Sequence, residues 1–84
     1  NFIENDRSIL NGKEIDLLLE AEDHFIAIEV KATENADKND ARSFTGLQEI
    51  LNKPLKHCFV LSNDYQVKNF GENITAMHTA AFLG

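Results

Sequence analysis

Two acidic residues and one lysine have the types and spacing needed to hydrolyse a phosphodiester. Asp16 lies in the run EIDLLLE, and Glu29 and Lys31 lie in the run HFIAIEVK that follows it. Carboxylates are hard oxygen ligands of the kind that Mg²⁺ accepts, with water and phosphate oxygens completing its octahedron. A neighbouring lysine can hold the attacking water or steady negative charge on a phosphate. The three residues therefore suggest a metal-dependent hydrolytic site.

Both runs alternate between apolar and polar residues, a pattern typical of half-buried β-strands. A tight turn at residues 22–23 would place Glu20 opposite Phe25, and the same register places Asp16 opposite Glu29. Like charges facing each other across a strand pair destabilise it. A divalent cation would reverse the sign of that interaction.

We therefore predict a magnesium site in which Asp16 and Glu29 are the metal ligands and Lys31 is the third catalytic residue. Glu14 lies opposite Lys31 in the same register and is an auxiliary candidate. The alternative is that these charged side chains face water at the end of a hairpin. An ion pair between Glu14 and Lys31 would then contribute less than ~1 kcal/mol.

One face of the predicted hairpin is aliphatic throughout, so we expect another layer to cover it. Its residues are Ile15, Leu17, Leu19, Ile26, Ile28 and Val30. Asn11-Gly12 favours a type I′ turn, which would fold Arg7–Leu10 back on Lys13–Asp16. The result is a three-stranded antiparallel meander. In it Arg7 would lie beside Asp16 and form an ordinary cross-strand ion pair with it.

Residues 32–38 lack hydrophobic periodicity and are expected to form a loop. A helix capped by Asp37 or Asn39 should run to about Asn52, with Pro54 just beyond its end. Its inward face would carry Phe44, Leu47, Gln48 and Leu51. Gln48 must find partners for its amide, which solvent can supply at the edge of this face.

The apolar run His57–Ser62 is expected to form a strand added parallel to the one that ends near Val30. Gln66–Phe70 and Ile74–Met77 then predict short edge strands, and Thr79–Leu83 a terminal helical turn. The expected fold mixes helices and strands, α/β in the broad sense and α+β in the narrower one. The antiparallel meander comes first, then a crossover helix, then the strand added in parallel.

Glu14-Ile-Asp16 followed by Ile28-Glu-Val-Lys31 resembles the PD-(D/E)XK nuclease superfamily, which has the restriction-endonuclease-like fold. The wider series resembles the nuclease-like domain of unknown function at the C-terminus of prokaryotic AAA-type P-loop ATPases. That series comprises Asn11-Gly-Lys-Glu-Ile-Asp16, Ile28-Glu-Val-Lys-Ala32, Asp40-Ala-Arg42, Phe70-Gly71, Ile74-Thr-Ala-Met77 and Ala81-Phe-Leu83.

The resemblance implies metal-ligating roles for Asp16 and Glu29 and a catalytic role for Lys31. In this superfamily a polar residue on the helix after these strands often reaches toward the active site, which makes Gln48 an auxiliary candidate. Ile15 stands where the superfamily has its name-giving proline. The superfamily also carries a first acidic residue on a helix before the first strand, which we expect to precede this chain. On this basis residues 1–84 are one domain, a C-terminal fragment of a longer ATPase-like polypeptide.

The 84 residues carry a net charge of −6 without a cluster of Lys or Arg, which argues against avid nucleic-acid binding. The single Cys58 is expected to be a small buried hydrophobe, and a reducing cytoplasm suits it. The sequence offers no bilayer-spanning stretch and so predicts no membrane partner. Expected partners are the parent ATPase chain and a second copy, with nucleic acid as the substrate if the site is active.

Two functional readings remain open. The first is Mg²⁺-dependent phosphodiester hydrolysis. The second is a catalytically inactive nuclease-like fold that serves its ATPase as an interaction or dimerisation module.

Overall fold

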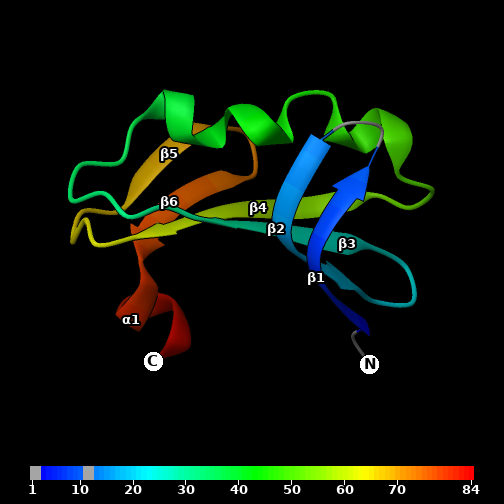
Figure 1. The fold of residues 1–84 in the computed structure, drawn as a ribbon, viewed down its shortest axis with the longest axis horizontal. Helices are drawn as coiled ribbons and strands as arrows, with labels where there is room; N and C mark the ends of the chain where they lie inside the picture. The colour runs from blue at the N-terminus through cyan, green and yellow to red at the C-terminus, as the bar shows by residue number, and fades with distance from the viewer. Residues whose placement is uncertain (1–2, 11–12) are drawn as a thin grey trace.

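The alternating runs at the start of the chain form strands of a mixed six-stranded sheet (Figure 1). The computed structural model describes residues 3–10 and 13–84, with side chains from residue 15 onward. In chain order the elements are β1 (Ile3–Leu10), β2 (Lys13–Glu20), β3 (Phe25–Val30), η1 (Lys38–Phe44), η2 (Leu47–Ile50), β4 (Leu55–Ser62), β5 (Lys68–Gly71), β6 (Ile74–His78) and α1 (Thr79–Leu83). The fold is α+β.

The predicted antiparallel meander is confirmed. β1 pairs antiparallel with β2, and β2 pairs antiparallel with β3. The second hairpin has the expected register, with Glu20 opposite Phe25 and Leu18 opposite Ala27. The type I′ turn predicted at Asn11-Gly12 lies outside the described residues.

The parallel half of the sheet follows the meander. β4 lies parallel to β3, as predicted, and β6 lies parallel to β4. β5 pairs antiparallel with β6, so the strand order is β1-β2-β3-β4-β6-β5. Only β5 of the last two strands is an edge strand. The prediction that both were edges was wrong for β6, because the β5–β6 hairpin inserts its second strand beside β4.

The predicted long helix is replaced by two 3₁₀ helices, η1 and η2. Asp37 caps η1 through a capping box with Asp40, as the sequence suggested for its start. The chain then becomes extended at Thr45 and takes a left-handed φ of 76° at Gly46. Glycine adopts this conformation at little cost, so the helix is interrupted there.

The 3₁₀ geometry also changes which residues face inward. With about three residues per turn, positions i, i+3 and i+6 share a face. Ala41 and Phe44 follow this spacing within η1 and are both buried, and Leu47, the first residue of η2, is buried as well. Gln48, which the α-helical period placed on the inner face, is exposed instead.

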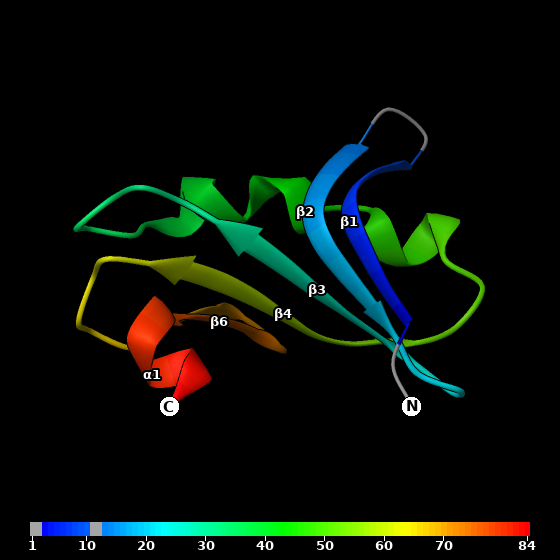
Figure 2. The same cartoon turned by 60° about the horizontal axis from the view of Figure 1, so that its bottom comes forward.

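The core lies between the sheet and the two 3₁₀ helices, which run along one side of the sheet while α1 lies on the other (Figures 1 and 2). Four strands contribute to this core: β2 through Ile15 and Leu18, β3 through Phe25 and Ala27, β4 through Cys58 and Val60, and β6 through Ala76. The buried cluster consists of Ile15, Leu18, Phe25, Ala27, Ala36, Ala41, Phe44, Leu47, Cys58, Val60 and Ala76.

The aliphatic face that we expected to be covered is covered only in part. Ile28 is buried, and Ile15 is buried in the core cluster that also contains Phe25 and Ala27. Leu17 and Ile26 are half-buried, and Val30 is 55% exposed. The helices pack on the opposite face, the one occupied by Phe25 and Ala27. On the aliphatic side, Phe82 of α1 contacts the Phe59 ring, with ring centroids 5.0 Å apart.

Candidate functional site

β2 and β3 part at the position where the sequence placed the candidate site. Their ladder ends at the pair Leu17 and Ile28. Beyond this pair, side-chain carboxylates replace main-chain carbonyls as hydrogen-bond acceptors. The Asp16 N–H donates to Glu29 Oε1 at 3.2 Å. In return, the Val30 N–H donates to Asp16 Oδ2 at 3.0 Å. The two acidic side chains are thus each bound to the main chain of the other strand.

Glu29 points toward the helical layer. It is only 5% exposed, and its Oε2 accepts a hydrogen bond of 2.8 Å from the Ser43 hydroxyl in η1. A buried carboxylate needs such donors, because an unsatisfied charge in the interior is costly. Two strands and η1 together therefore fix the Glu29 carboxylate.

Lys31 comes two residues after Glu29, directly after the end of β3. Its Nζ lies 4.0 Å from Glu29 Oε2, and its side chain is 35% exposed. The Lys31 N–H donates to the Leu61 carbonyl at 2.9 Å, which fixes the main chain beside β4. The structure therefore brings the Lys31 ammonium to the same carboxylate that contacts the Asp16 main chain.

Sequence reasoning missed Ser43. The α-helical period did not place it among the inward residues, so no local pattern singled it out. The available signal was indirect. A glutamate on a strand face that also carries Phe25 and Ala27 requires a donor from whatever element covers that face.

Two further candidates lie differently from the central three. The Gln48 amide donates to the Lys53 carbonyl at 2.9 Å and accepts from the Leu55 N–H. Gln48 thereby holds the loop between η2 and β4, and both of these hydrogen bonds are to that loop and the start of β4, not to the candidate site. The main chain of Glu14 pairs with Ile9, and its side chain lies outside the described ones.

The ion pair proposed between Arg7 and Asp16 also involves a side chain outside the described ones. The strand pairs on either side of these two residues are described: Asp6 pairs with Leu17, and Ser8 pairs with Ile15. This register places Arg7 across from Asp16 in the β1–β2 hairpin.

The donor set fits a magnesium ion held by two carboxylates. Mg²⁺ is commonly bound by one or two carboxylates, with waters filling the other positions. A carboxylate offers about four lone-pair sites, and Glu29 uses two of them to accept hydrogen bonds from the Asp16 N–H and the Ser43 hydroxyl. Among the residues described, no group of three His, Cys, Asp or Glu side chains is arranged to hold a metal. Asp16 and Glu29 would therefore act as a pair.

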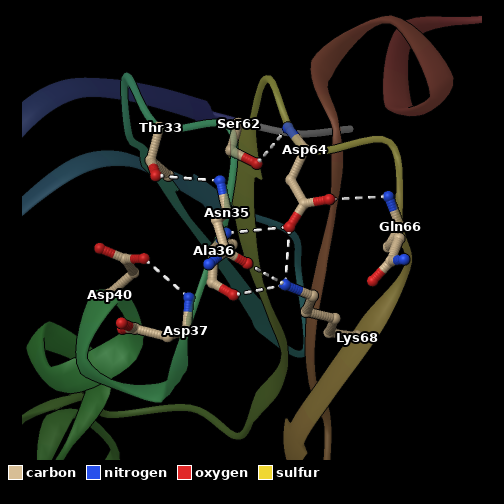
Figure 3. Close-up of polar contacts among 9 residues, drawn as sticks. All are labelled: Thr33, Asn35, Ala36, Asp37, Asp40, Ser62, Asp64, Gln66 and Lys68. Atoms are coloured by element: carbon tan, nitrogen blue, oxygen red, sulfur yellow. Dashed lines mark hydrogen bonds and ion pairs between the residues drawn. The ribbon is translucent and has the colours of Figure 1, made fainter.

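A second buried carboxylate, Asp64, lies just after β4 (Figure 3). One oxygen accepts from the Ala36 N–H at 2.9 Å and pairs with Lys68 Nζ at 2.7 Å. The other accepts from the Gln66 N–H at 2.9 Å. The hydrogen bond from Lys68, followed by the one from Gln66, lowers the pKa of Asp64 to about 2. The sequence indicated only a turn here.

Cys58 is buried, as predicted. Burial raises the pKa of its thiol to about 11, so the thiolate form is scarce near neutral pH. Among the helices in the described part of the chain, none has the length and apolar character needed to cross a bilayer.

Comparison with known proteins places most of this chain in one family. The family model described as "Domain of unknown function (DUF4143)" matches residues 8–82. Searches of curated proteins and of solved structures found no match. The matched segment contains all of the central site residues, Asp16, Glu29, Ser43 and Lys31. The chain belongs to the DUF4143 family.

Proposed function

We propose that this domain hydrolyses phosphodiesters with a divalent metal, using Asp16 and Glu29 as ligands and Lys31 as an assisting ammonium. The observation that carries this proposal is the meeting of Glu29 with both the Asp16 main chain and Lys31, where β2 and β3 part. We further propose that the domain is the C-terminal, nuclease-like part of an AAA-type ATPase.

Each residue has a distinct task in this proposal. Bound magnesium would lower the pKa of a coordinated water. Ser43 and the Asp16 N–H hold the Glu29 carboxylate, so its orientation is set before any ligand arrives. Lys31, only partly exposed, supplies positive charge beside Glu29 for an attacking water or a phosphate oxygen.

The topology supports the resemblance to the restriction-endonuclease-like fold. An antiparallel meander carries Asp16 and Glu29 on adjacent strands, and a helical connection then leads to the parallel strand β4. This order agrees with the series of motifs in the sequence. The same series supports attachment to an ATPase.

The nucleic-acid substrate must be bound despite a net charge of −6. Lys38 and Arg42 on η1 both line a hollow of about 400 Å³ that also includes Thr45 and Phe70. These two cations lie on η1, the helix that also carries Ser43, and give phosphate groups a local attraction. Because these are only two charges, we expect weak, salt-sensitive binding by this domain.

The direct test is a cleavage assay on labelled single- and double-stranded DNA and RNA with Mg²⁺ or Mn²⁺. Asp16→Asn, Glu29→Gln and Lys31→Met should each reduce the rate by about 100-fold or more. The matched controls Glu49→Gln and Lys56→Met change exposed side chains of the same types and should cleave like the unmodified protein. Equal rates in all six proteins would assign the activity to a contaminant and end the proposal.

A second function is favoured by the exposed part of the aliphatic sheet face. Leu17, Leu19 and Ile26 are half-buried there and Val30 is 55% exposed, which is unusual for four neighbouring aliphatic residues. An inactive fold that serves as an interaction or dimerisation module would use this face. It predicts a defined oligomer in light scattering that Ile26→Glu disperses and Lys31→Met leaves intact. A monomer at all concentrations would exclude self-association.

A further inference from the structure

A hollow separate from the candidate hydrolytic site lies at the carboxyl ends of β3, β4 and β6. It has a volume of about 570 Å³ and is lined by residues 34–35, residues 63–66 and His78. Crevices at the carboxyl ends of parallel strands are common ligand sites in open α/β sheets. None of the residues proposed for hydrolysis lines this hollow, so what it binds is a separate question.

Tyr65 is the most unusual residue in the hollow, because its large ring is 85% exposed and yet held in place. One side of the ring stacks on His78, with centroids 4.3 Å apart and planes 14° from parallel. The Nδ1 of His78 accepts from the Ala80 N–H at 3.0 Å, which orients the imidazole. The Tyr65 ring therefore has a supported position on the surface.

The main chain on both sides of Tyr65 is also fixed. The Gln66 N–H donates to Asp64 Oδ1 at 2.9 Å, which closes an Asx turn over Tyr65. The Asp64 N–H donates to the Ser62 hydroxyl at 3.1 Å, and Lys68 and Ala36 hold the other Asp64 oxygen (Figure 3). A preorganised aromatic ring loses little entropy when a ligand stacks on it.

The charges around the ring select the kind of ligand. The lining contains two carboxylates, Glu34 and Asp64, and neither lysine nor arginine. Lys68 neutralises Asp64, whereas Glu34 is exposed and makes no ion pair with any residue that the structure describes. The exposed Asn63 and Gln66 add side-chain amides, which can accept as well as donate. The hollow therefore offers an aromatic face beside Glu34, a carboxylate that no cation in the described part of the chain neutralises, which favours a cationic ligand over a phosphate.

We propose that this hollow binds an arginine side chain of a partner protein. A guanidinium is planar, so it can stack on Tyr65, and its fork of donors suits a carboxylate such as Glu34. The net charge of −6 also draws basic partners toward this domain. A lysine ammonium lacks the planar stacking surface. A nucleotide would bring its phosphate toward Glu34.

The test is an NMR titration of the ¹⁵N-labelled chain with N-acetyl-arginine amide as the probe. The matched probes are N-acetyl-citrulline amide, which keeps the shape without the charge, N-acetyl-lysine amide and AMP. The arginine probe should shift the amide signals of Tyr65 and Gln66 and bind at least roughly threefold more tightly than each of the other three. Equal binding of citrulline, or tighter binding of lysine or AMP, would overturn the assignment, as would shifts confined to other regions.

Variants localise the binding. Tyr65→Ala and Glu34→Gln should each weaken the arginine probe by roughly two- to fivefold, and Tyr65→Phe should bind like the unmodified chain. Val67→Ala is the control, because Val67 is 62% exposed in the same loop but does not line the hollow. Unchanged affinity in both Tyr65→Ala and Glu34→Gln would refute the proposal. None of these results depends on hydrolytic activity.

Discussion

The Asp16 N–H donates to the Glu29 carboxylate across the gap that opens between β2 and β3. This hydrogen bond replaces a main-chain ladder contact, so the Glu29 side chain helps to hold the two strands together. It also holds a 5% exposed carboxylate in a fixed orientation. One contact therefore serves the fold and prepares the candidate site, and substitutions of Glu29 should report on both roles.

Removal of the Glu29 carboxylate should destabilise the fold. Glu29→Ala leaves the Asp16 N–H and the Ser43 hydroxyl without their acceptor, and we expect a loss of about 2–4 kcal/mol of unfolding free energy. Glu29→Gln retains an oxygen acceptor and should lose about half as much. Urea denaturation followed by circular dichroism measures both values. Equal stability of Glu29→Ala and the unmodified protein would show that these contacts are not formed in solution.

Gln48 should behave as a structural residue. Gln48→Ala removes the side chain that bonds the Lys53 carbonyl and the Leu55 N–H, and should cost about 1–2 kcal/mol in urea denaturation. Metal affinity and cleavage should not change once the protein is folded. A selective loss of cleavage with unchanged stability would instead restore Gln48 to the site.

Asp64 should contribute to acid sensitivity. Its pKa is lowered to about 2 in the folded protein, from an ordinary value near 3.8. A depressed carboxylate pKa gives stability that is present above the ordinary value and lost as the pH falls through the folded one. Stability should therefore decrease between about pH 4 and pH 2. Urea midpoints across this range should show a shallower decrease for Asp64→Asn; an unchanged slope would mean that other carboxylates dominate.

Cys58 should resist alkylation while the protein is folded. Its thiol is 4% exposed and its pKa is raised to about 11, so both access and ionisation are low. Iodoacetamide at about pH 8 should modify it only on the timescale of unfolding, and quickly in urea. Mass spectrometry follows the modification. Rapid labelling without denaturant would show that β4 opens readily.

The sheet was largely predictable because its strands carry local signals. The period-two alternation of β2 and β3, with a polar turn between them, fixes their register through residue pairs such as Leu18 and Ala27. The apolar run in β4 predicted a covered strand, and its distance from β3 predicted parallel pairing. The same register predicted Asp16 opposite Glu29, but the ladder ends at Leu17 and Ile28, so Asp16 and Glu29 are joined by a hydrogen bond from main chain to side chain instead.

The helical connection was less predictable because it depends on one residue. The left-handed conformation of Gly46 interrupts the helix, so the α-helical period does not continue from Phe44 to Gln48, and Gln48 is exposed. Ser43 and Asp64 were missed for a related reason. Each bonds a residue at least 14 positions away in the chain, Glu29 and Ala36 respectively, and no local pattern encodes such a contact.

The covered face of the sheet also required tertiary information. The more continuous aliphatic face, ending at Val30, was expected to be covered, but the 3₁₀ helices pack on the face of Phe25 and Ala27. Periodicity shows that a strand has two different faces. It does not show on which of them a later segment packs when both carry apolar residues.

Metal binding at Asp16 and Glu29 can be measured most directly by calorimetric titration of the folded domain with Mn²⁺ and Mg²⁺. We predict one saturable site with a dissociation constant in the millimolar range or tighter. Asp16→Asn and Glu29→Gln should weaken it at least about tenfold, while the control Glu49→Gln binds normally. Absence of binding, or equal affinity in Asp16→Asn, Glu29→Gln and the unmodified protein, would contradict a metal site at this pair of strands.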